Sequence, residues 1–173
     1  MLYAAYGSNL HPLRLLLRLP EARFAGTAEL ASHRLCFHKR SQDKSGKCNI
    51  VRGDDSVHIA IYELNGREKA ELDQIEGAGV GYSVEEIEVP GFGECFTYIA
   101  TASFIDDDLR PYSWYKALVL AGCEGLRLPN DYIAMIQRIA SIEDPDRARH
   151  VNNMKIVEQT RMSANAVSVS GGK

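Results

Sequence analysis

Apolar and polar residues alternate with a period of two along much of the first hundred residues, a pattern typical of β-strands. The clearest case is VHIAIYEL, residues 57–64, in which Val57, Ile59 and Ile61 face one way and the residues between them face the other. We expect further strands, including a pair joined by a turn at residues 90–93. These strands are predicted over residues 2–6, 24–40, 81–90 and 93–104.

A spacing of three and four residues between apolar positions predicts helices in the remaining segments. In NGREKAELDQIEG, Asn65 can cap the first turn, Glu68 three residues later forms a near capping box with it, and Gly77 ends the helix. An earlier helix, which stops at Pro20, carries leucines at helical spacing, namely Leu13, Leu16 and Leu17. Three later helices are predicted over residues 112–125, 128–143 and about 145–159.

The order of these elements, with strands first and packed helices last, predicts one α+β domain with a curled and mainly antiparallel sheet. No repeat or internal linker interrupts the sequence, and 173 residues are enough to bury a core. We expect the domain to occupy residues 1–159. The remaining segment, residues 160–173, is small and polar and is expected to be a flexible tail.

The overall composition narrows the range of partners. Hydrophobic residues make up 45% of the chain, and 23 acidic residues against 20 basic ones give a net charge of −3. We therefore expect no nucleic-acid partner and no membrane partner. The sequence has no apolar run long enough to span a membrane, no basic-headed signal peptide and no CxxC spacing among its four cysteines. We expect a cytoplasmic protein with reduced thiols.

Glu76 is the strongest candidate for chemistry among the titratable residues, because it lies in the last turn of its predicted helix. The negative end of the helix dipole, the nearby Glu71 and Asp73, and apolar neighbours would all favour its protonated form. A carboxyl group whose pKa is raised in this way suits general acid/base catalysis near neutral pH. The alternative is a solvated glutamate at a frayed helix end, which the residues alone favour because most glutamates lie at the surface.

Other kinds of site are weaker candidates. Cys36 and His38 share one face of their predicted strand, with Cys48 and His58 as further candidate ligands, but none has paired metal-ligand spacing. Neither EGAGVGY nor SGKC matches a nucleotide-binding fingerprint. No histidine is placed in the sequence beside a cysteine or Ser8 in a known nucleophilic arrangement. We therefore expect no metal site.

Three motifs together give the chain a family resemblance. They are YAAYGSNL at residues 3–10, LDQIEGAGVGY at residues 72–82 and YSWYKALVLAGCEGLRLPNDY at residues 112–132. An N-terminal Tyr-Gly-Ser-Asn loop followed at a distance by a Glu-Gly pair is the mark of the γ-glutamylcyclotransferase family, which this chain resembles from residue 2 to about residue 143. The resemblance implies a small mixed β-barrel with flanking helices, no metal, no organic cofactor and a homodimer.

The resemblance also implies roles for residues of this chain. Backbone N–H groups of the loop would hold the γ-glutamyl part of a small-molecule substrate, since glycine lets a ligand approach the backbone and consecutive amides favour anions. Glu76 matches the catalytic acid/base of the family, and three tyrosines match residues that line its pocket. The expected substrate-binding residues are Tyr6, Gly7, Ser8, Asn9, Leu10, Tyr82, Tyr98 and Tyr115.

The implied reaction is the cyclisation of a γ-glutamyl amide to 5-oxoproline with release of an amine or amino acid. The catalytic residues leave the departing group open, because the same chemistry serves γ-glutamyl dipeptides, γ-glutamylamines and specialised γ-glutamylated metabolites. A basic stretch would favour an acidic leaving group or is simply a solvated loop; it comprises Lys39, Arg40, Lys44, Lys47 and Arg52. A binding module that keeps the cleft without catalysis is the alternative from a different class.

Overall fold

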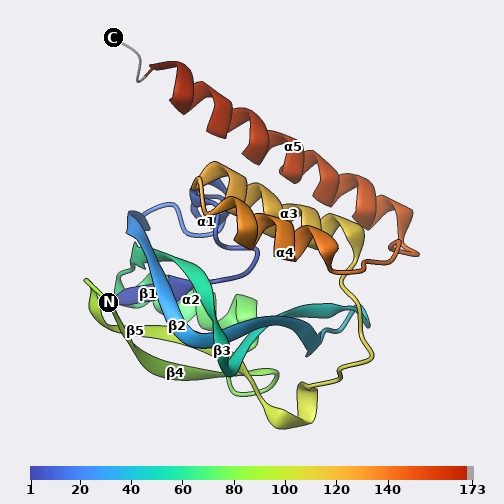
Figure 1. Ribbon diagram of the computed structural model, residues 1–173, viewed down its shortest axis with the longest axis horizontal. Helices are drawn as coiled ribbons and strands as arrows, with labels where there is room; N and C mark the ends of the chain where they lie inside the picture. The colour runs from blue at the N-terminus through green and yellow to red at the C-terminus, as the bar shows by residue number, and fades with distance from the viewer. Residues whose placement is uncertain (171–173) are drawn as a thin grey trace.

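The computed structural model describes the backbone of residues 1–170 and the side chains of residues 1–163. Within that range, five strands form one mixed sheet in the order β2-β3-β1-β5-β4, and most of the helices lie together above it (Figure 1). The strands are β1 (Leu2–Ala5), β2 (Arg23–Arg40), β3 (Gly46–Glu63), β4 (Tyr82–Val89) and β5 (Gly93–Ala100). The helices are α1 (Pro12–Leu16), α2 (Gly66–Glu76), α3 (Ser113–Gly125), α4 (Asn130–Arg138) and α5 (Arg147–Ser170), with a 3-10 turn, η1, at Ala102–Phe104.

Strand β1 is central in the sheet and carries the chain into the interior. It pairs antiparallel with β3 along its whole length and parallel with β5, with Tyr3 opposite Phe96. One parallel pair among antiparallel ones confirms a mixed, mainly antiparallel α+β domain. The expected barrel needs a correction, because closure would require a ladder between the end strands β2 and β4, which the described residues lack. The sheet is open.

Strands β2 and β3 form a long hairpin that bends over the rest of the sheet. Each has 18 residues, and the register shifts at Phe24/Gly26, Ala31/His33 and Cys36/Lys39. Such irregularities bend and twist a hairpin. The strand predicted over residues 24–40 is confirmed, whereas the alternating segment 57–64 is only the later part of β3. The earlier part was not predicted, because its polar Arg-Gly-Asp-Asp run hides the alternation.

Helix α2 begins and ends where the sequence predicts. The Asn65 side chain accepts hydrogen bonds from the N–H groups of Arg67 and Glu68 at 3.0 and 2.9 Å, and the Glu68 carboxylate accepts from Asn65 N–H at 3.1 Å. Gly77 closes the helix in the left-handed conformation, at φ +69°, which glycine adopts without steric cost. Glu76 is consequently the last helical residue, so the helix end fixes its position.

Helix α1 buries different leucines from those expected. Leu15 and Leu19 are fully buried, whereas Leu16 and Leu17 are 38% and 58% exposed. The leucines at the predicted helical spacing, Leu13, Leu16 and Leu17, are therefore not the ones that are fully buried. A helix of five residues completes little more than one turn, so the packing around it, and not its periodicity, selects the buried side chains.

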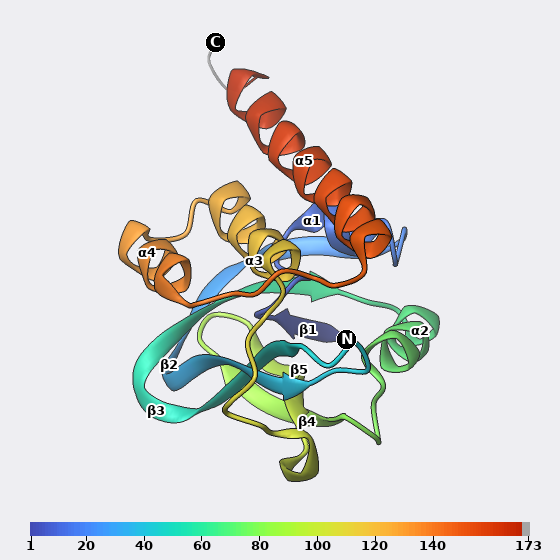
Figure 2. The same ribbon diagram turned by 90° about the vertical axis from the view of Figure 1, so that its right-hand side faces the viewer.

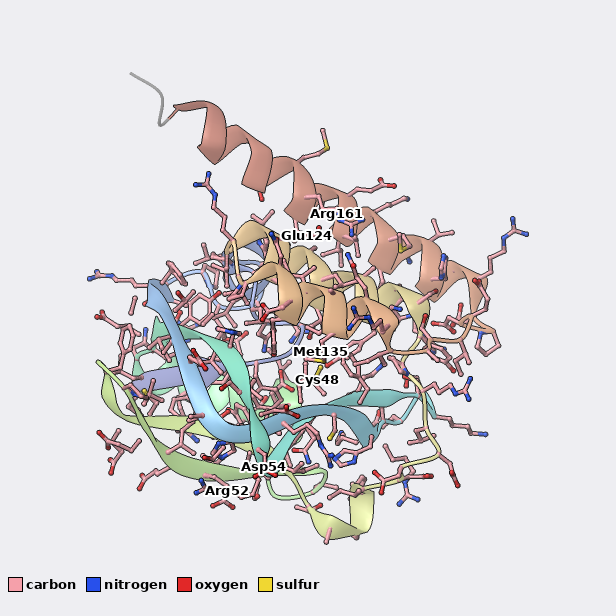
Figure 3. The ribbon with its side chains drawn as sticks, viewed as in Figure 1. Cys48, Arg52, Asp54, Glu124, Met135 and Arg161 are labelled. Atoms are coloured by element: carbon pink, nitrogen blue, oxygen red, sulfur yellow. The ribbon has the colours of Figure 1, made fainter. Side chains whose placement is uncertain are left out.

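The C-terminal helices cover one side of the sheet, and α2 lies apart from them (Figure 2). Helix α3 is buried along most of its length because it lies between the strands and α5, which explains why most of its residues are apolar. Arg161 on α5 contacts Glu124 on α3, with Nε 3.1 Å from Oε2, and so joins the two helices at the surface (Figure 3).

Helix α5 is longer than the sequence predicts. The expected helix ends near residue 159, but α5 continues to Ser170, and its last turns extend beyond the body of the molecule (Figure 1). The sequence has no glycine or proline between Gln159 and Gly171 that would end it. The boundary expected after residue 159 therefore falls inside a helix, and residues 171–173 of the expected tail lie outside the described residues. No described helix is long and apolar enough to cross a membrane.

Candidate active site

The loop between β1 and α1 forms one end of the candidate site. After β1 the chain turns through Gly7, Ser8 and Asn9, and Leu10 N–H donates to the C=O of Gly7 at 3.0 Å. Among the described residues, the N–H groups of Gly7, Ser8 and Asn9 have no acceptor within the protein. Successive amides without partners form a concavity that favours an anion. The loop is therefore suited to holding a carboxylate.

Glu76 reaches this loop from the end of α2. Its Oε1 accepts a hydrogen bond from Asn9 Nδ2 at 3.0 Å and lies 3.4 Å from Arg18 Nη1. Arg18 also donates to Asn9 Oδ1 at 3.0 Å, and Asn9 Nδ2 has Tyr3 Oη as a second acceptor at 3.3 Å. The Glu76 side chain is 21% exposed. One buried asparagine thus orients the carboxylate and joins it to a guanidinium group.

Two tyrosines hold the start of β3 against the loop. Tyr82 Oη donates to the C=O of Cys48 at 2.6 Å, and Cys48 N–H donates to Tyr115 Oη at 3.2 Å. Gly7 packs against the same place, since a Cβ on Gly7 would lie 3.1 Å from Cys48 Cβ and 3.3 Å from the Tyr115 hydroxyl. These contacts bring the loop, β3, β4 and α3 together around one wall of the site.

The tyrosines of the site are neutral hydrogen-bonding groups. Burial raises the pKa of Tyr6, Tyr82 and Tyr115 well above the ordinary value. Burial, and then the hydrogen bond that Tyr98 Oη donates to Asp73 Oδ1 at 2.8 Å, raise the pKa of Tyr98. Tyr6 in turn donates to the C=O of Tyr98. Each phenol therefore keeps its proton near neutral pH and can donate it in a hydrogen bond.

Two cavities meet at Glu76. The inner cavity, of about 30 Å³, is lined by the loop and by tyrosines, and it has room for one small polar group. The outer cavity, of about 170 Å³, continues past Glu76 along α1, the β2–β3 turn and α3. Ser8, Glu76, Tyr82 and Tyr115 line both cavities. The carboxylate therefore lies where a molecule bound across both cavities passes from one into the other.

The outer cavity is rich in cations. Its basic lining residues are Arg14, Arg18, Lys39 and Lys47. Two of them have carboxylate partners: Arg18 pairs with Glu76, and Lys47 Nζ lies 2.7 Å from Asp43 Oδ2. Lys47 Nζ also lies 4.6 Å from the centre of the Trp114 ring. A group that enters the outer cavity therefore meets a positive potential.

The sequence of this site matches a known family. Residues 3–117 match the family model described as gamma-glutamyl cyclotransferase, AIG2-like. This range is more than half of the chain, and it includes both the loop at residues 6–9 and Glu76. The chain belongs to this family.

Two relatives and a solved structure support the assignment to the γ-glutamylcyclotransferase family. The human gamma-glutamylcyclotransferase is 31% identical over 150 residues, and the mouse protein 30% identical over 149, each covering 80% of this chain and 78% of the relative. A solved structure of a gamma-glutamyl cyclotransferase has a TM-score of 0.79 and 26% identity, covering 92% of this chain and 98% of that one. The family that the motifs indicate is confirmed, and so is the mixed, mainly antiparallel α+β fold, with an open sheet in place of the expected barrel.

This γ-glutamylcyclotransferase-family chain brings most of the predicted site residues together. Those that line the inner cavity are Tyr6, Gly7, Ser8, Asn9, Glu76, Tyr82, Tyr98 and Tyr115. Leu10 lines neither cavity, because its side chain is fully buried in the core and its C=O accepts a hydrogen bond from Tyr62 Oη at 2.7 Å. Its side chain therefore lies outside both cavities, and its contacts are with the core.

Four residues that were not predicted from the sequence reach the site through tertiary contacts. They are Tyr3, Arg14, Arg18 and Trp114, each of which lines one of the two cavities. Arg14 and Arg18 are four residues apart in a segment predicted as a helix, which places them on one side of it. That spacing, with two charges beside an apolar run, is a signal from which this pair could have been predicted.

The residues considered as metal ligands have other contacts. His38 contacts Asp107 Oδ1 through Nδ1 at 2.6 Å and Asn49 through Nε2 at 3.0 Å. Within the described side chains, no group of three or more His, Cys, Asp or Glu residues could hold a metal ion. Burial raises the pKa of the Cys48 thiol, so this cysteine contributes no thiolate to the inner cavity that it lines.

Proposed function

We propose that the protein cyclises the γ-glutamyl group of a γ-glutamyl amide to 5-oxoproline and releases an amine or amino acid, with Glu76 as general acid/base. The observation that carries this proposal is the position of the Glu76 carboxylate, 3.0 Å from Asn9 of the loop and at the junction of two cavities. Membership of the γ-glutamylcyclotransferase family supports the same class of reaction.

Each of the two cavities holds a different part of the substrate. The inner cavity receives the α-carboxylate of the γ-glutamyl group, for which the N–H groups of Gly7, Ser8 and Asn9 are donors. The α-ammonium group then lies at Glu76, and the amide with its leaving group extends into the outer cavity. Holding a flexible substrate in this folded shape contributes on the order of 7–11 kcal/mol to catalysis in the best intramolecular cases.

The chemistry needs only proton transfers and one exchange of C–N bonds. Glu76 removes a proton from the α-ammonium group, and the amine nitrogen attacks the γ-carbonyl carbon to close a five-membered ring. Tyr115, which accepts a hydrogen bond from Cys48 and retains its own hydroxyl hydrogen, is a donor for the carbonyl oxygen as it gains charge. After the attack the ring nitrogen still carries one proton too many, which Glu76 also removes. The old amide C–N bond breaks as the departing nitrogen takes up both protons from Glu76, one after the other. Overall, two protons move from the α-nitrogen to the departing nitrogen, and no water is consumed.

The test is 5-oxoproline release from a panel of γ-glutamyl dipeptides and γ-glutamylamines. Glu76→Gln keeps the size of the side chain but removes its ability to take a proton, so turnover is expected to fall by about 100-fold or more. Glu71→Gln, an exposed position on the same helix, is the matched control and is expected to keep full turnover.

Two outcomes would count against the proposal in different ways. Nearly full turnover by Glu76→Gln would remove Glu76 from the mechanism while leaving the reaction in place. Binding of γ-glutamyl compounds by the wild type without any 5-oxoproline would contradict the reaction itself and indicate a binding module.

A further inference from the structure

The outer cavity holds more positive charge than the proposed reaction needs. Glu76 is the one charged residue among the described residues that line the inner cavity, whereas the outer cavity adds Arg14, Arg18, Lys39 and Lys47. Arg18 is paired with Glu76 at 3.4 Å, and Lys47 has its own carboxylate partner at 2.7 Å. Two cations, Arg14 and Lys39, remain.

Arg14 and Lys39 have no carboxylate partner among the described side chains. Arg14 Nε is buried and makes no hydrogen bond, and Lys39 Nζ lies 4.5 Å from the centre of the Tyr82 ring. Burial lowers the pKa of Lys39, and burial followed by the charge of Arg18 lowers the pKa of Arg14 to about 10, so Arg14 stays cationic at neutral pH. A half-buried cation without a counter-ion is costly, and a bound anion offsets that cost.

We propose that the outer cavity is a subsite for a leaving amino acid with two anionic groups, its α-carboxylate and a side-chain carboxylate, held by Arg14 and Lys39. The inference rests on the proposed function, because it names the leaving group of that reaction. Two carboxylates match the two unpaired cations in number and charge, and a guanidinium group can bind one of them in a bidentate fashion. The preferred substrates are γ-glutamyl dipeptides that end in glutamate or aspartate.

The γ-glutamyl end of the substrate does not require these two cations. Its α-carboxylate has the loop amides as donors, and its α-ammonium group has Glu76 as a partner. Both charges of that end are therefore already paired. A γ-glutamylamine, whose leaving group has no carboxylate, would leave Arg14 and Lys39 unpaired in a confined cavity. The charge distribution therefore favours an acidic amino acid over a simple amine.

The decisive experiment compares substrates that differ only in charge. Rates of 5-oxoproline release are measured for γ-glutamyl-glutamate against γ-glutamyl-glutamine, and for γ-glutamyl-aspartate against γ-glutamyl-asparagine. We expect kcat/KM to be about 10- to 100-fold higher for the acidic member of each pair, the range of a hydrogen-bonded charge pair. The preference is expected to shrink as salt is added, because the outer cavity is open to solvent.

Variants locate the preference within the cavity. Lys39→Gln and Arg14→Gln are each expected to lower the ratio of acidic to neutral kcat/KM by about 5-fold or more. Arg52→Gln is the control from the same basic stretch: Arg52 is exposed, lines neither cavity and lies on the sheet away from the helices (Figure 3). Its ratio should equal that of the wild type. Inhibition of the wild type by free glutamate, stronger than by free glutamine, checks the same subsite without any variant.

The outcomes separate this inference from the proposed function. If 5-oxoproline is released but the acidic and neutral members of each pair react equally, the anionic subsite is overturned and the cyclotransferase reaction stands. If both variants fold, as judged by thermal denaturation, and keep the wild-type ratio, Arg14 and Lys39 are not its determinants. If no member of the panel yields 5-oxoproline, the proposed function fails and the leaving-group subsite fails with it.

Discussion

Asn9 shows how a single side chain can fix the orientation of a carboxylate. Its amide nitrogen donates to Glu76 Oε1 at 3.0 Å and its amide oxygen accepts from Arg18 at 3.0 Å, so both ends of a planar group are in use. Asn9 is 3% exposed, and a buried amide with both ends bonded has little freedom to rotate. The orientation of Glu76 therefore depends on the loop as well as on its own helix.

Asn9→Ala is expected to lower kcat by about 10-fold or more, because Glu76 loses the hydrogen bond that aims it and a bond to a charged group contributes about 1.5–3 kcal/mol. The measurement is the rate of 5-oxoproline release at saturating substrate, together with its pH profile. A change in stability alone would leave the shape of that profile unaltered. Asn152→Ala, at an exposed position on α5, is the control, and an unchanged kcat in Asn9→Ala would contradict the positioning role.

Helix α2 determines where Glu76 lies relative to the loop. Its capping box fixes the first turn and the left-handed Gly77 fixes the last, where two carbonyls accept from the backbone of the cap: Gly77 N–H lies 3.3 Å from Gln74 C=O and Ala78 N–H lies 2.8 Å from Asp73 C=O. Both ends of the helix are therefore set locally. Fraying of the last turn would move Glu76 directly.

Gly77→Ala is expected to lower the free energy of unfolding by about 1–2 kcal/mol, the cost of a left-handed conformation for a residue with a Cβ. No described atom lies within 4 Å of the added Cβ, so the effect is one of the backbone and not of a clash. Chemical denaturation measures it. Gly77→Asn, which tolerates this conformation better, should lose less stability and retain more turnover. Equal losses for the two variants would contradict the strain argument.

At the scale of the whole molecule, Asp144 ties the start of α5 to the wall of the outer cavity. Its buried carboxylate accepts hydrogen bonds from Trp114 Nε1 at 2.7 Å and from Arg149 Nε at 2.7 Å. Trp114 lines the outer cavity, and Arg149 lies on the first turns of α5. The C-terminal helix thus supports the site without entering it.

Asp144→Asn is expected to lower the free energy of unfolding by about 1.5–3 kcal/mol near neutral pH, because two charge-assisted hydrogen bonds are weakened. The hydrogen bond from Arg149 is the main cause that lowers the pKa of Asp144 to about 2, from 3.8. The wild-type advantage is therefore full above pH 3.8 and is lost as the pH falls toward 2. Denaturation of both proteins across this range measures the difference, and a constant difference would contradict the assignment.

Local patterns were enough to predict the elements whose boundaries are set by neighbouring residues. The capping box and Gly77 placed α2 within the sequence, and the turn at residues 90–93 placed the β4–β5 hairpin. The leucines of α1 that are buried differ from those at the predicted spacing, because packing against distant elements selects them. The first part of β3 was not predicted, because its polar run hides the alternation. The length of α5 was underestimated because small polar residues do not end a helix.

The sequence by itself determined the family, the loop and the candidate acid/base, since each belongs to a contiguous motif. The conformations of the loop backbone and of the helix end depend on neighbouring residues. Only the tertiary structure decided which groups surround Glu76. Asn9, Arg18 and the other cations of the outer cavity lie far from Glu76 in the chain, and β1 brings the loop against α2 and α3. Charge in a cavity depends on distances across the fold, and those distances arise only when the hydrophobic core forms between the sheet and its helices.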